Sequence, residues 1–308
     1  MANRLWRLGN AGVLALGIIG AGGCGFESSS GLQQLQGLPA AYPGYTGQYQ
    51  GFTLKVDDRF DYFNGGLWTR GDGAFGETKC RFQQQGAQVR DGELQLLVRP
   101  EFVPASYSND QNRIIGAYNY SCGEVRSRSE YLYGRFEVRM RNPVPQRASG
   151  YISSLFTYRN REEENYRWRE IDIEMEGIRP NKFQSNLILG EGTYDWSATR
   201  LWGAYEQVQW IGATSQWKVY AMEWTPASIK WFVDGRLMRT LSRSDVNQKQ
   251  ASLPPHQRIS IPELPGQVMM NFWIPNDLIA PVFGGVTTGN QYPIVVRYDW
   301  FRYYAYTP

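Results

Sequence analysis

The chain has 308 residues, of which 42% are hydrophobic and 20% charged, so it is long enough to bury a full core. Its formal net charge is +3, and since Arg4 and Arg7 lie in a first segment without acids, the remainder is close to neutral. That balance gives no electrostatic case for binding nucleic acid or an acidic membrane. A single histidine, His256, also argues against histidine-rich zinc sites and Ser-His-Asp triads.

Residues 1–23 have the pattern of an export signal. A basic start is followed by an apolar stretch at 11–19 and by small residues before Cys24, and the apolar stretch is too short for an ordinary membrane span. Small residues before a cysteine resemble the bacterial lipobox, in which the cysteine is acylated, and Gly25 after it is associated with the outer membrane in that resemblance. The sequence therefore predicts an exported outer-membrane lipoprotein, with plain secretion as the alternative.

Residues 24–50 are rich in Ser, Gly, Gln and Pro and show no apolar periodicity. Such a composition is typical of a flexible tether. The expected organisation is a signal peptide over 1–23, a tether over 24–50 and one folded domain over 51–308.

The first part of that domain alternates in the manner of β-strands. Strands are predicted over 87–90, over 94–98 after the turn Asp91-Gly92, and over 134–140. Cys80 and Cys122 also lie in this part, and an exported protein with two such cysteines favours one disulfide, with two separate buried thiols as the alternative.

Residues 170–176 are the most informative segment, because acids and large apolar residues alternate strictly. Successive side chains of a strand point to opposite faces. One face would carry Glu170, Asp172, Glu174 and Glu176, and the other Ile171, Ile173 and Met175. Like charges placed side by side repel unless a proton, a cation or a substrate relieves them. The pattern therefore favours a functional site over the alternative, a solvent-exposed strand with an acidic outer face.

The remaining chain continues in short strands. They are expected over 217–224, over the hairpin 229–238 with its turn at Asp234-Gly235, and over 295–304 near the C-terminus. No segment has a long helical stripe of apolar residues. Many short strands at regular spacing predict an all-β sandwich.

Two chemistries could use the acidic row: binding a hard cation, or attack on a glycosidic bond. A straight strand is a poor cage for calcium, which prefers loops that wrap around the ion. A retaining glycosidase needs two carboxyl groups about 5 to 5.5 Å apart. Because residues four apart on a strand have Cα atoms roughly 13 Å apart, Glu170 and Glu174 would have to lean toward each other on a curved sheet. The three acids of such a cluster are expected to titrate together.

The sequence Glu170-Ile171-Asp172-Ile173-Glu174 resembles the signature of glycoside hydrolase family 16. It has the unbulged form shared by bacterial lichenases and xyloglucan-active enzymes, whereas the bulged laminarinase-type form would place its second Glu at position 175, which is Met175. The resemblance implies that Glu170 is the nucleophile, Asp172 its helper and Glu174 the acid/base. Glu176 lies outside the motif.

Similarity to lichenases extends over most of residues 55–305. It implies a jelly-roll β-sandwich of two curved antiparallel sheets with an open concave cleft, and Cys80 and Cys122 resemble the cysteines of the lichenase disulfide. The sugar-contacting positions that it implies are Glu124, Arg126, Trp168, Asn186, Asn271 and Trp273. Each has a structural alternative: the tryptophans could be core residues, the Glu–Arg pair a surface ion pair, and the asparagines partners of backbone groups.

Four segments depart from the lichenase pattern. The loop 72–77 is shorter and lacks the expected Asn, residues 187–189 are Leu-Ile-Leu where lichenases carry tyrosines, in a manner similar to the xyloglucan-enzyme branch, and 277–285 lacks a Trp. The segment 194–209 resembles an insertion with aromatic residues of its own, Trp196, Trp202 and Tyr205. These segments shape sugar subsites, so they leave mixed-linkage specificity open.

The expected function is thus a retaining endo-β-glycanase that hydrolyses internal bonds of a β-glucan. The expected partner is a polysaccharide, the chain is expected to be a monomer, and membrane contact is expected only through the lipid anchor. No cofactor is implied, although the resemblance allows a structural calcium ion away from the cleft. The alternatives are a transglycosylase, an exopolysaccharide-trimming glycanase, and a non-catalytic carbohydrate-binding jelly roll.

Overall fold

The computed structural model describes residues 41–159, 166–192, 200–252 and 258–308. The predicted signal peptide, Cys24, most of the predicted tether and His256 lie outside these residues. The regular structure of the described chain is almost entirely β-strand, with one short α-helix, α2 (Arg243–Lys249), so the predicted all-β class is confirmed. Among the described residues, no helix has the length and apolar character needed to cross a membrane.

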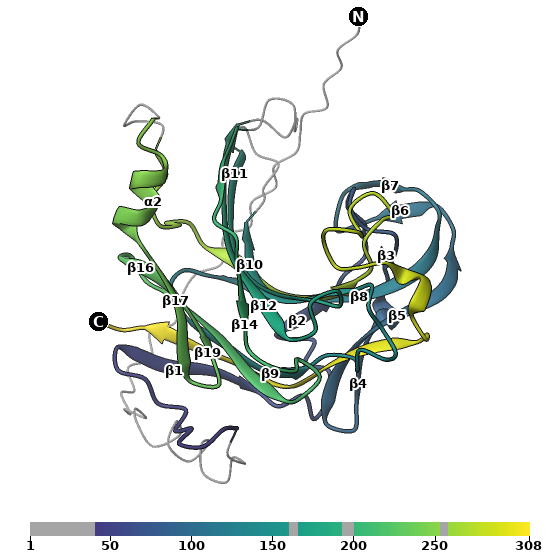
Figure 1. Cartoon of the computed structure of the whole chain (residues 1–308), viewed down its shortest axis with the longest axis horizontal. Helices are drawn as coiled ribbons and strands as arrows, with labels where there is room; N and C mark the ends of the chain where they lie inside the picture. Colours follow the sequence, from purple (N-terminus) through teal and green to yellow (C-terminus); the bar gives the residue numbers. More distant parts are fainter. Residues whose placement is uncertain (1–40, 160–165, 193–199, 253–257) are drawn as a thin grey trace, which may run out of the picture. The chain divides into compact units, whose positions relative to one another are not determined.

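One sheet forms the outer layer of the sandwich (Figure 1). Its strand β19 pairs along one side with β9 and along the other with β1 and β5. The strands of this sheet are β1 (Phe52–Asp58), β4 (Ala87–Arg90), β5 (Glu93–Val103), β9 (Gly134–Arg141), β15 (Lys218–Trp224), β16 (Ser228–Val233), β17 (Arg236–Ser242) and β19 (Ile294–Tyr306).

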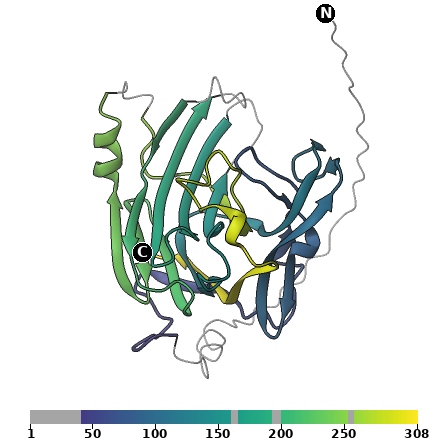
Figure 2. The ribbon, with the colours of Figure 1, turned by 45° about the vertical axis from the view of Figure 1, so that its right-hand side comes forward.

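The second sheet lies over the first, and its strands run side by side in Figure 2. In spatial order they are β2 (Trp68–Arg70), β8 (Tyr118–Tyr131), β18 (Gly266–Trp273), β10 (Ile152–Arg159), β11 (Tyr166–Glu176) and β12 (Lys182–Gly192), with β13 (Arg200–Ala204) and β14 (Gln207–Trp210) both pairing with β12. The catalytic motif predicted from the sequence lies on β11, well inside this sheet.

Short elements complete the fold. They are β3 (Arg81–Phe82), the hairpin β6 (Ser106–Ser108) and β7 (Arg113–Ile115), and the 3₁₀ turns η1 (Gln84–Gly86) and η3 (Thr287–Gly289). Strand β3 pairs with β8 in parallel, an exception to the antiparallel pairing that was expected. The start of β8 also pairs with the end of β5, which joins the two sheets.

Local sequence explains the turns that were predicted. In the Asp91-Gly92 and Asp234-Gly235 turns both residues have positive φ, between 47° and 75°. Two consecutive residues of this kind form the primed hairpin turn that matches strand twist, and Asp and Gly tolerate that conformation best. These turns connect β4 to β5 and β16 to β17 as expected.

The N-terminal part of the described chain packs against the outer sheet. Tyr45 and Tyr49 donate hydrogen bonds to the buried carboxylate of Glu137 at 3.1 and 2.5 Å, and Arg302 donates to the Tyr45 hydroxyl at 2.5 Å. Residues 42–50, the N-terminal strap, therefore belong to the folded domain although they were predicted as tether. The sequence does not reveal this, because the tyrosines that make these hydrogen bonds are scattered among Gly, Gln and Pro without apolar periodicity.

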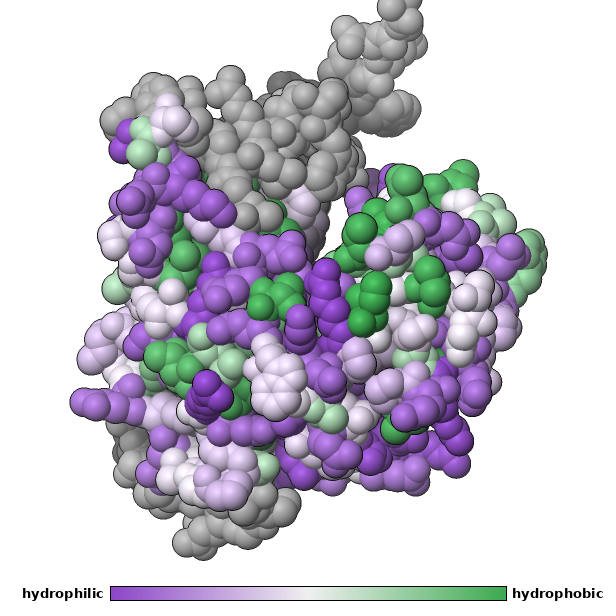
Figure 3. Space-filling view, in the orientation of Figure 1, coloured by the Kyte–Doolittle hydropathy of each residue, from purple (hydrophilic) through white to green (hydrophobic). Residues whose placement is uncertain are grey.

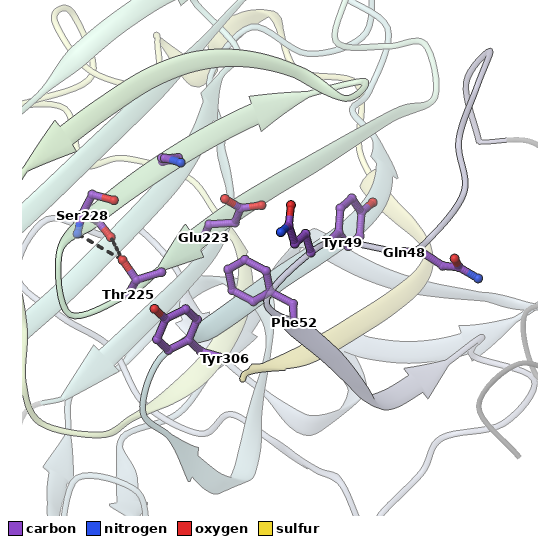
Figure 4. A pocket seen from close by; sticks show the side chains of 9 residues that line it. Gln48, Tyr49, Phe52, Glu223, Thr225, Ser228 and Tyr306 are labelled. Atoms are coloured by element: carbon purple, nitrogen blue, oxygen red, sulfur yellow. Dashed lines mark hydrogen bonds between the residues drawn. The ribbon is translucent and has the colours of Figure 1, made fainter. Parts of the chain in front are cut away.

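The N-terminal strap also borders a small polar pocket on the outer sheet (Figure 4). Its lining includes Gln48 and Tyr49 from the strap, Glu223 from β15 and Tyr306 from β19. Arg135 donates a hydrogen bond of 2.8 Å to the Glu223 carboxylate, so the charge of this acid is balanced within the protein.

Candidate active site

The acids of β11 point into a cleft on the exposed face of the second sheet, and the apolar residues point into the core. Ile171, Ile173 and Met175 are at most 1% exposed, whereas Glu170, Asp172 and Glu174 line the cleft. The alternation predicted from residues 170–176 is therefore confirmed for these six side chains.

Neighbouring strands bring matching rows of side chains to the same face. On β10, Tyr158, Phe156 and Ser154 lie opposite Glu170, Asp172 and Glu174. On β12 the opposing residues are Ile188, Asn186 and Gln184. All six line the cleft, since directly paired residues of adjacent strands share a face. The acidic strand is thus flanked by two rows that contribute no charge.

The two glutamates have different hydrogen-bond partners. Trp168 donates its indole N–H to Glu170 Oε2 at 2.5 Å, and Asp172 also hydrogen-bonds the Glu170 carboxylate. Gln184 donates its amide to Glu174 Oε2 at 3.0 Å. Donors to a carboxylate stabilise its charged form, so both glutamates are held by groups that favour ionisation.

Burial disfavours the ionised form of both glutamates, and its effect on their pKa values is larger than that of the hydrogen bonds. Desolvation raises the pKa of Glu170 to about 7, and the hydrogen bonds from Trp168 and Asp172 lower it only in part. Desolvation and, after it, the negative charges of Glu170 and Glu176 together raise the pKa of Glu174 to about 8. Asp172, which is 3% exposed between them, has its pKa raised by burial and by both glutamates. Near neutral pH, Glu170 therefore ionises before Glu174.

The cleft has a volume of about 740 Å³, enough to hold several sugar-sized groups. Apolar side chains from loops line it beyond the acids, among them Phe75, Ile279 and Phe283. Figure 3 shows apolar atoms gathered beside the hollow on the side where Figure 1 places β3 and the β6–β7 hairpin. The cleft thus combines a polar, acidic floor with an apolar wall.

The structure brings all six predicted sugar-contacting residues to this cleft. Glu124 and Arg126 form an ion pair of 2.6 Å between Glu124 Oε1 and Arg126 Nε, and Glu124 is 2% exposed. Burial raises the pKa of Glu124. This pair lies in the cleft floor on β8, so it is not the exposed surface pair of the alternative interpretation.

The other predicted contacts are partly engaged within the protein. The Asn271 side-chain oxygen accepts a hydrogen bond from Ser154 at 2.6 Å, and that of Asn186 accepts one from the Leu187 amide at 2.9 Å. Trp273 is only 5% exposed, because the Phe75 ring lies 4.8 Å away and the Phe283 ring 6.0 Å away, measured between ring centroids. Much of the aromatic surface at Trp273 therefore comes from the two phenylalanines, which were not predicted.

The β6–β7 hairpin contributes a further cleft residue that was not predicted. Asp110 lies at its tip, with a carboxylate oxygen 3.6 Å from Arg126 Nη1, and it accepts a hydrogen bond from the Asp72 amide at 2.7 Å. Asp110 is 16 residues before Arg126 in a segment without strand alternation of its own, so no local pattern in the sequence indicates the contact. The guanidinium group of Arg126 lies between two carboxylates.

Cys80 and Cys122 form a disulfide with Cα atoms 5.8 Å apart, which confirms the pairing that the family resemblance implies. Both cysteines are fully buried. Cys122 lies on β8 two residues before Glu124, so the bond ties the segment before β3 to the strand that carries Glu124 and Arg126.

Three carboxylates of the outer sheet, away from the cleft, are paired with arginines and so are not free ligands for the structural calcium that the resemblance allows. Asp57, Glu137 and Asp299 contact the guanidinium groups of Arg302, Arg135 and Arg139 at 2.8, 2.7 and 2.6 Å. Within the described part of the chain, no group of three or more Asp, Glu, His or Cys side chains could hold a metal ion. We assign no role to calcium.

Comparisons with known proteins agree with this geometry. Residues 77–280 match the model of "Glycosyl hydrolases family 16". The chain belongs to this family. Over 249 residues it is 32% identical to a beta-glucanase of Bacillus amyloliquefaciens, a match that covers 79% of this chain and 84% of that protein. As a member of the family, the chain is a glycoside hydrolase that acts on O-glycosyl bonds.

Solved structures support the same assignment. The Bacillus licheniformis beta-glucanase superposes with a TM-score of 0.59 at 27% identity, covering 83% of this chain and 99% of that one. The laminarinase catalytic domain of Thermotoga maritima has a TM-score of 0.62 at 19% identity, covering 83% of this chain and 99% of that one. At that identity the second likeness concerns the fold, which is the family 16 jelly roll.

Proposed function

We propose that this family 16 enzyme is a retaining endo-β-glycanase that cleaves internal bonds of a β-glucan by double displacement. The observation that carries the proposal is the unequal environment of the two cleft glutamates. Glu170 receives hydrogen bonds from Trp168 and Asp172, whereas Glu174 is crowded by the charges of Glu170 and Glu176. A retaining mechanism needs this difference, because one carboxyl must be ionised while the other still holds its proton.

In the first step the ionised Glu170 attacks the anomeric carbon and forms a glycosyl-enzyme bond. Glu174 transfers its proton to the departing glycosidic oxygen. Asp172 holds a proton because its own pKa is raised, and its hydrogen bond to Glu170 stabilises the nucleophile's charge. In the second step Glu174 accepts a proton from water, which attacks the anomeric carbon and releases Glu170.

The substrate class is supported by the cleft and by the relatives. Several relatives are beta-glucanases by name, including one from Bacillus subtilis at 32% identity over 80% of this chain. The cleft is an open hollow on the sheet, and an open cleft suits binding within a long polymer. Ile188 contributes an apolar surface next to Glu170, where the lichenase resemblance implies tyrosine.

The test is a panel of mixed-linkage glucan, xyloglucan, laminarin and a succinoglycan-like polymer, with products sized and their linkages determined. We expect internal cleavage of a β-glucan that Glu170→Ala abolishes. Glu93→Gln is the matched control, since it changes an acid of the outer sheet paired with Arg297 at 2.7 Å. A Glu170→Ala enzyme with full activity on every cleaved glycan would overturn the assignment. Longer products on addition of an oligosaccharide acceptor would instead indicate a transglycosylase.

Export and acylation of Cys24 stay predictions from the sequence. Mass spectrometry of the mature N-terminus tests them directly. An acylated Cys24 as first residue is expected, and an unmodified N-terminus beyond Cys24 would favour plain secretion.

A further inference from the structure

Glu176 is the fourth acid of the row on β11, and it takes no part in the bond-making steps of the proposed mechanism, although its charge helps to raise the pKa of Glu174. Its side chain is buried, with the whole residue 3% exposed. One carboxylate oxygen accepts a hydrogen bond from Arg179 Nη1 at 2.5 Å, and the other accepts one from the backbone amide of Gly284 at 3.0 Å. The acid therefore connects the end of the catalytic strand to the loop 276–286.

Arg179 contacts the same loop at Val282, two residues before Gly284. Its second guanidinium nitrogen, Nη2, donates to the carbonyl oxygen of Val282 at 3.2 Å. The Glu176–Arg179 pair thus holds one backbone group just before Phe283 and one just after it. A planar guanidinium that binds a carboxylate and a carbonyl together fixes both in a defined geometry.

The backbone at Gly284 is fixed further by its surroundings. Its carbonyl accepts hydrogen bonds from the amides of Ile178 and Tyr151, at 3.0 and 3.2 Å. Gly284 has a φ of +81°, and a Cβ at this position would lie 2.4 Å from the Ile152 side chain. Close approach to the sheet requires glycine here, and it places the neighbouring Phe283 at the cleft.

Phe283 is part of the apolar cleft wall, together with Ile279. Its ring centroid lies 6.0 Å from that of Trp273, which Phe75 covers from another side. Because Trp273 is largely buried, Phe283 and Phe75 supply accessible aromatic surface at this end of the cleft. Aromatic rings bind sugar rings through their apolar faces.

We propose that Glu176 and Arg179 are positioning residues that hold Phe283 as a stacking surface for a sugar unit in the cleft. The inference rests on the proposed glycanase function and assigns a binding role to the acid outside the motif. Neither residue touches the reacting atoms. Their effect on substrate binding is exerted through the loop 276–286.

The first test is kinetic. Glu176→Leu should raise KM for a β-glucan about tenfold, because small displacements of a substrate-positioning group are enough for such losses, with kcat at each variant's own optimum pH little changed. Glu176→Gln keeps an oxygen acceptor for the Gly284 amide and should recover most of the affinity. Arg179→Met removes the Val282 contact and should resemble Glu176→Leu, and it serves if the leucine variant does not fold. Glu93→Gln is the control.

A double-mutant cycle separates positioning from a general effect on the fold. If Glu176 acts through Phe283, Glu176→Leu in a Phe283→Ala background should cause little further rise in KM. Additive effects on KM, or a Phe283→Ala enzyme with unchanged KM, would overturn the proposal. A loss confined to kcat would do so as well.

Amide hydrogen exchange gives a result that does not depend on activity. We expect the Gly284 amide to exchange at least tenfold faster in Glu176→Leu than in the parent, because its hydrogen-bond acceptor is lost. Unchanged exchange would refute the positioning role even if the parent cleaved no β-glucan. A parent that cleaves no β-glucan while the Gly284 amide is protected would instead refute the proposed function.

Discussion

Glu170 and Glu174 are the same residue type on the same strand, yet their neighbours give their carboxyl groups different pKa values. The donors at Glu170 lower its pKa relative to burial alone, and the acids around Glu174 raise that of Glu174. For the free enzyme we therefore expect a bell-shaped pH profile of kcat/KM. Activity should fall below about pH 7 as Glu170 becomes protonated, and above about pH 8 as Glu174 loses its proton.

Gln184 provides the variant that tests this interpretation. Its hydrogen bond lowers the pKa of Glu174, so Gln184→Leu should raise that pKa and move the alkaline limb of the profile to higher pH. The acid limb should stay in place, because Gln184 does not contact Glu170 in the hydrogen bonds described. A shift of the alkaline limb to lower pH would contradict the assignment of Glu174 as the acid.

The sequence predicted which side chains of β11 face the cleft because that information is local. Strict alternation over 170–176 determines which side chains share a face, and the motif implied their roles. Gln184, Asp110 and Phe283 could not be found in this way. Gln184 becomes a partner of Glu174 through the pairing of β11 with β12, and Phe283 reaches the cleft through hydrogen bonds to a strand more than a hundred residues earlier. Such contacts depend on the tertiary fold.

At the scale of the element, the acidic strand should cost stability. The folded-state pKa of Glu170 is about 7 against an ordinary 4.5, so the unfolded chain releases this proton at lower pH than the folded one. The free energy of unfolding should therefore decrease as pH rises from about 4.5 to 7. Glu170→Gln should be more stable than the parent at pH 8 by on the order of 3 kcal/mol, since one pKa unit corresponds to about 1.4 kcal/mol and the folded-state pKa lies more than two units above the ordinary value.

Urea unfolding at pH 4.5 and pH 8 measures this effect. The two proteins should differ little at the lower pH and diverge at the higher one. Equal stabilities at both values would show that the cleft does not penalise the charge of Glu170.

Strands with alternation and Asp-Gly turns were predicted close to their observed bounds, such as 87–90 for β4 and 134–140 for β9. The β6–β7 hairpin and the N-terminal strap were not. Both have polar, glycine-rich or irregular sequences, and both are held by a few specific side chains rather than by a periodic apolar face. The alternation of apolar and polar residues in the sequence therefore does not predict such elements.

For the whole molecule, the N-terminal strap makes a testable difference to where the domain begins. A chain that starts at Ala41 should unfold like the full mature protein. A chain that starts at Phe52 loses the tyrosine hydrogen bonds to Glu137 and Arg302. Its free energy of unfolding should be lower by about 4.5 kcal/mol or more, because three hydrogen bonds to charged groups are lost and each contributes about 1.5 to 3 kcal/mol. Equal unfolding free energies of the two chains would show that residues 42–50 belong to the tether and not to the folded domain.

The central claim is that Glu170 and Glu174 cleave a β-glucan with retention at the anomeric carbon. Proton NMR of the first products, recorded before the anomers interconvert, tests it most directly. Double displacement inverts the anomeric centre twice, so the β-anomer should appear first and the α-anomer should grow in later by mutarotation. Initial release of the α-anomer would mean single displacement and would contradict the roles given to both glutamates.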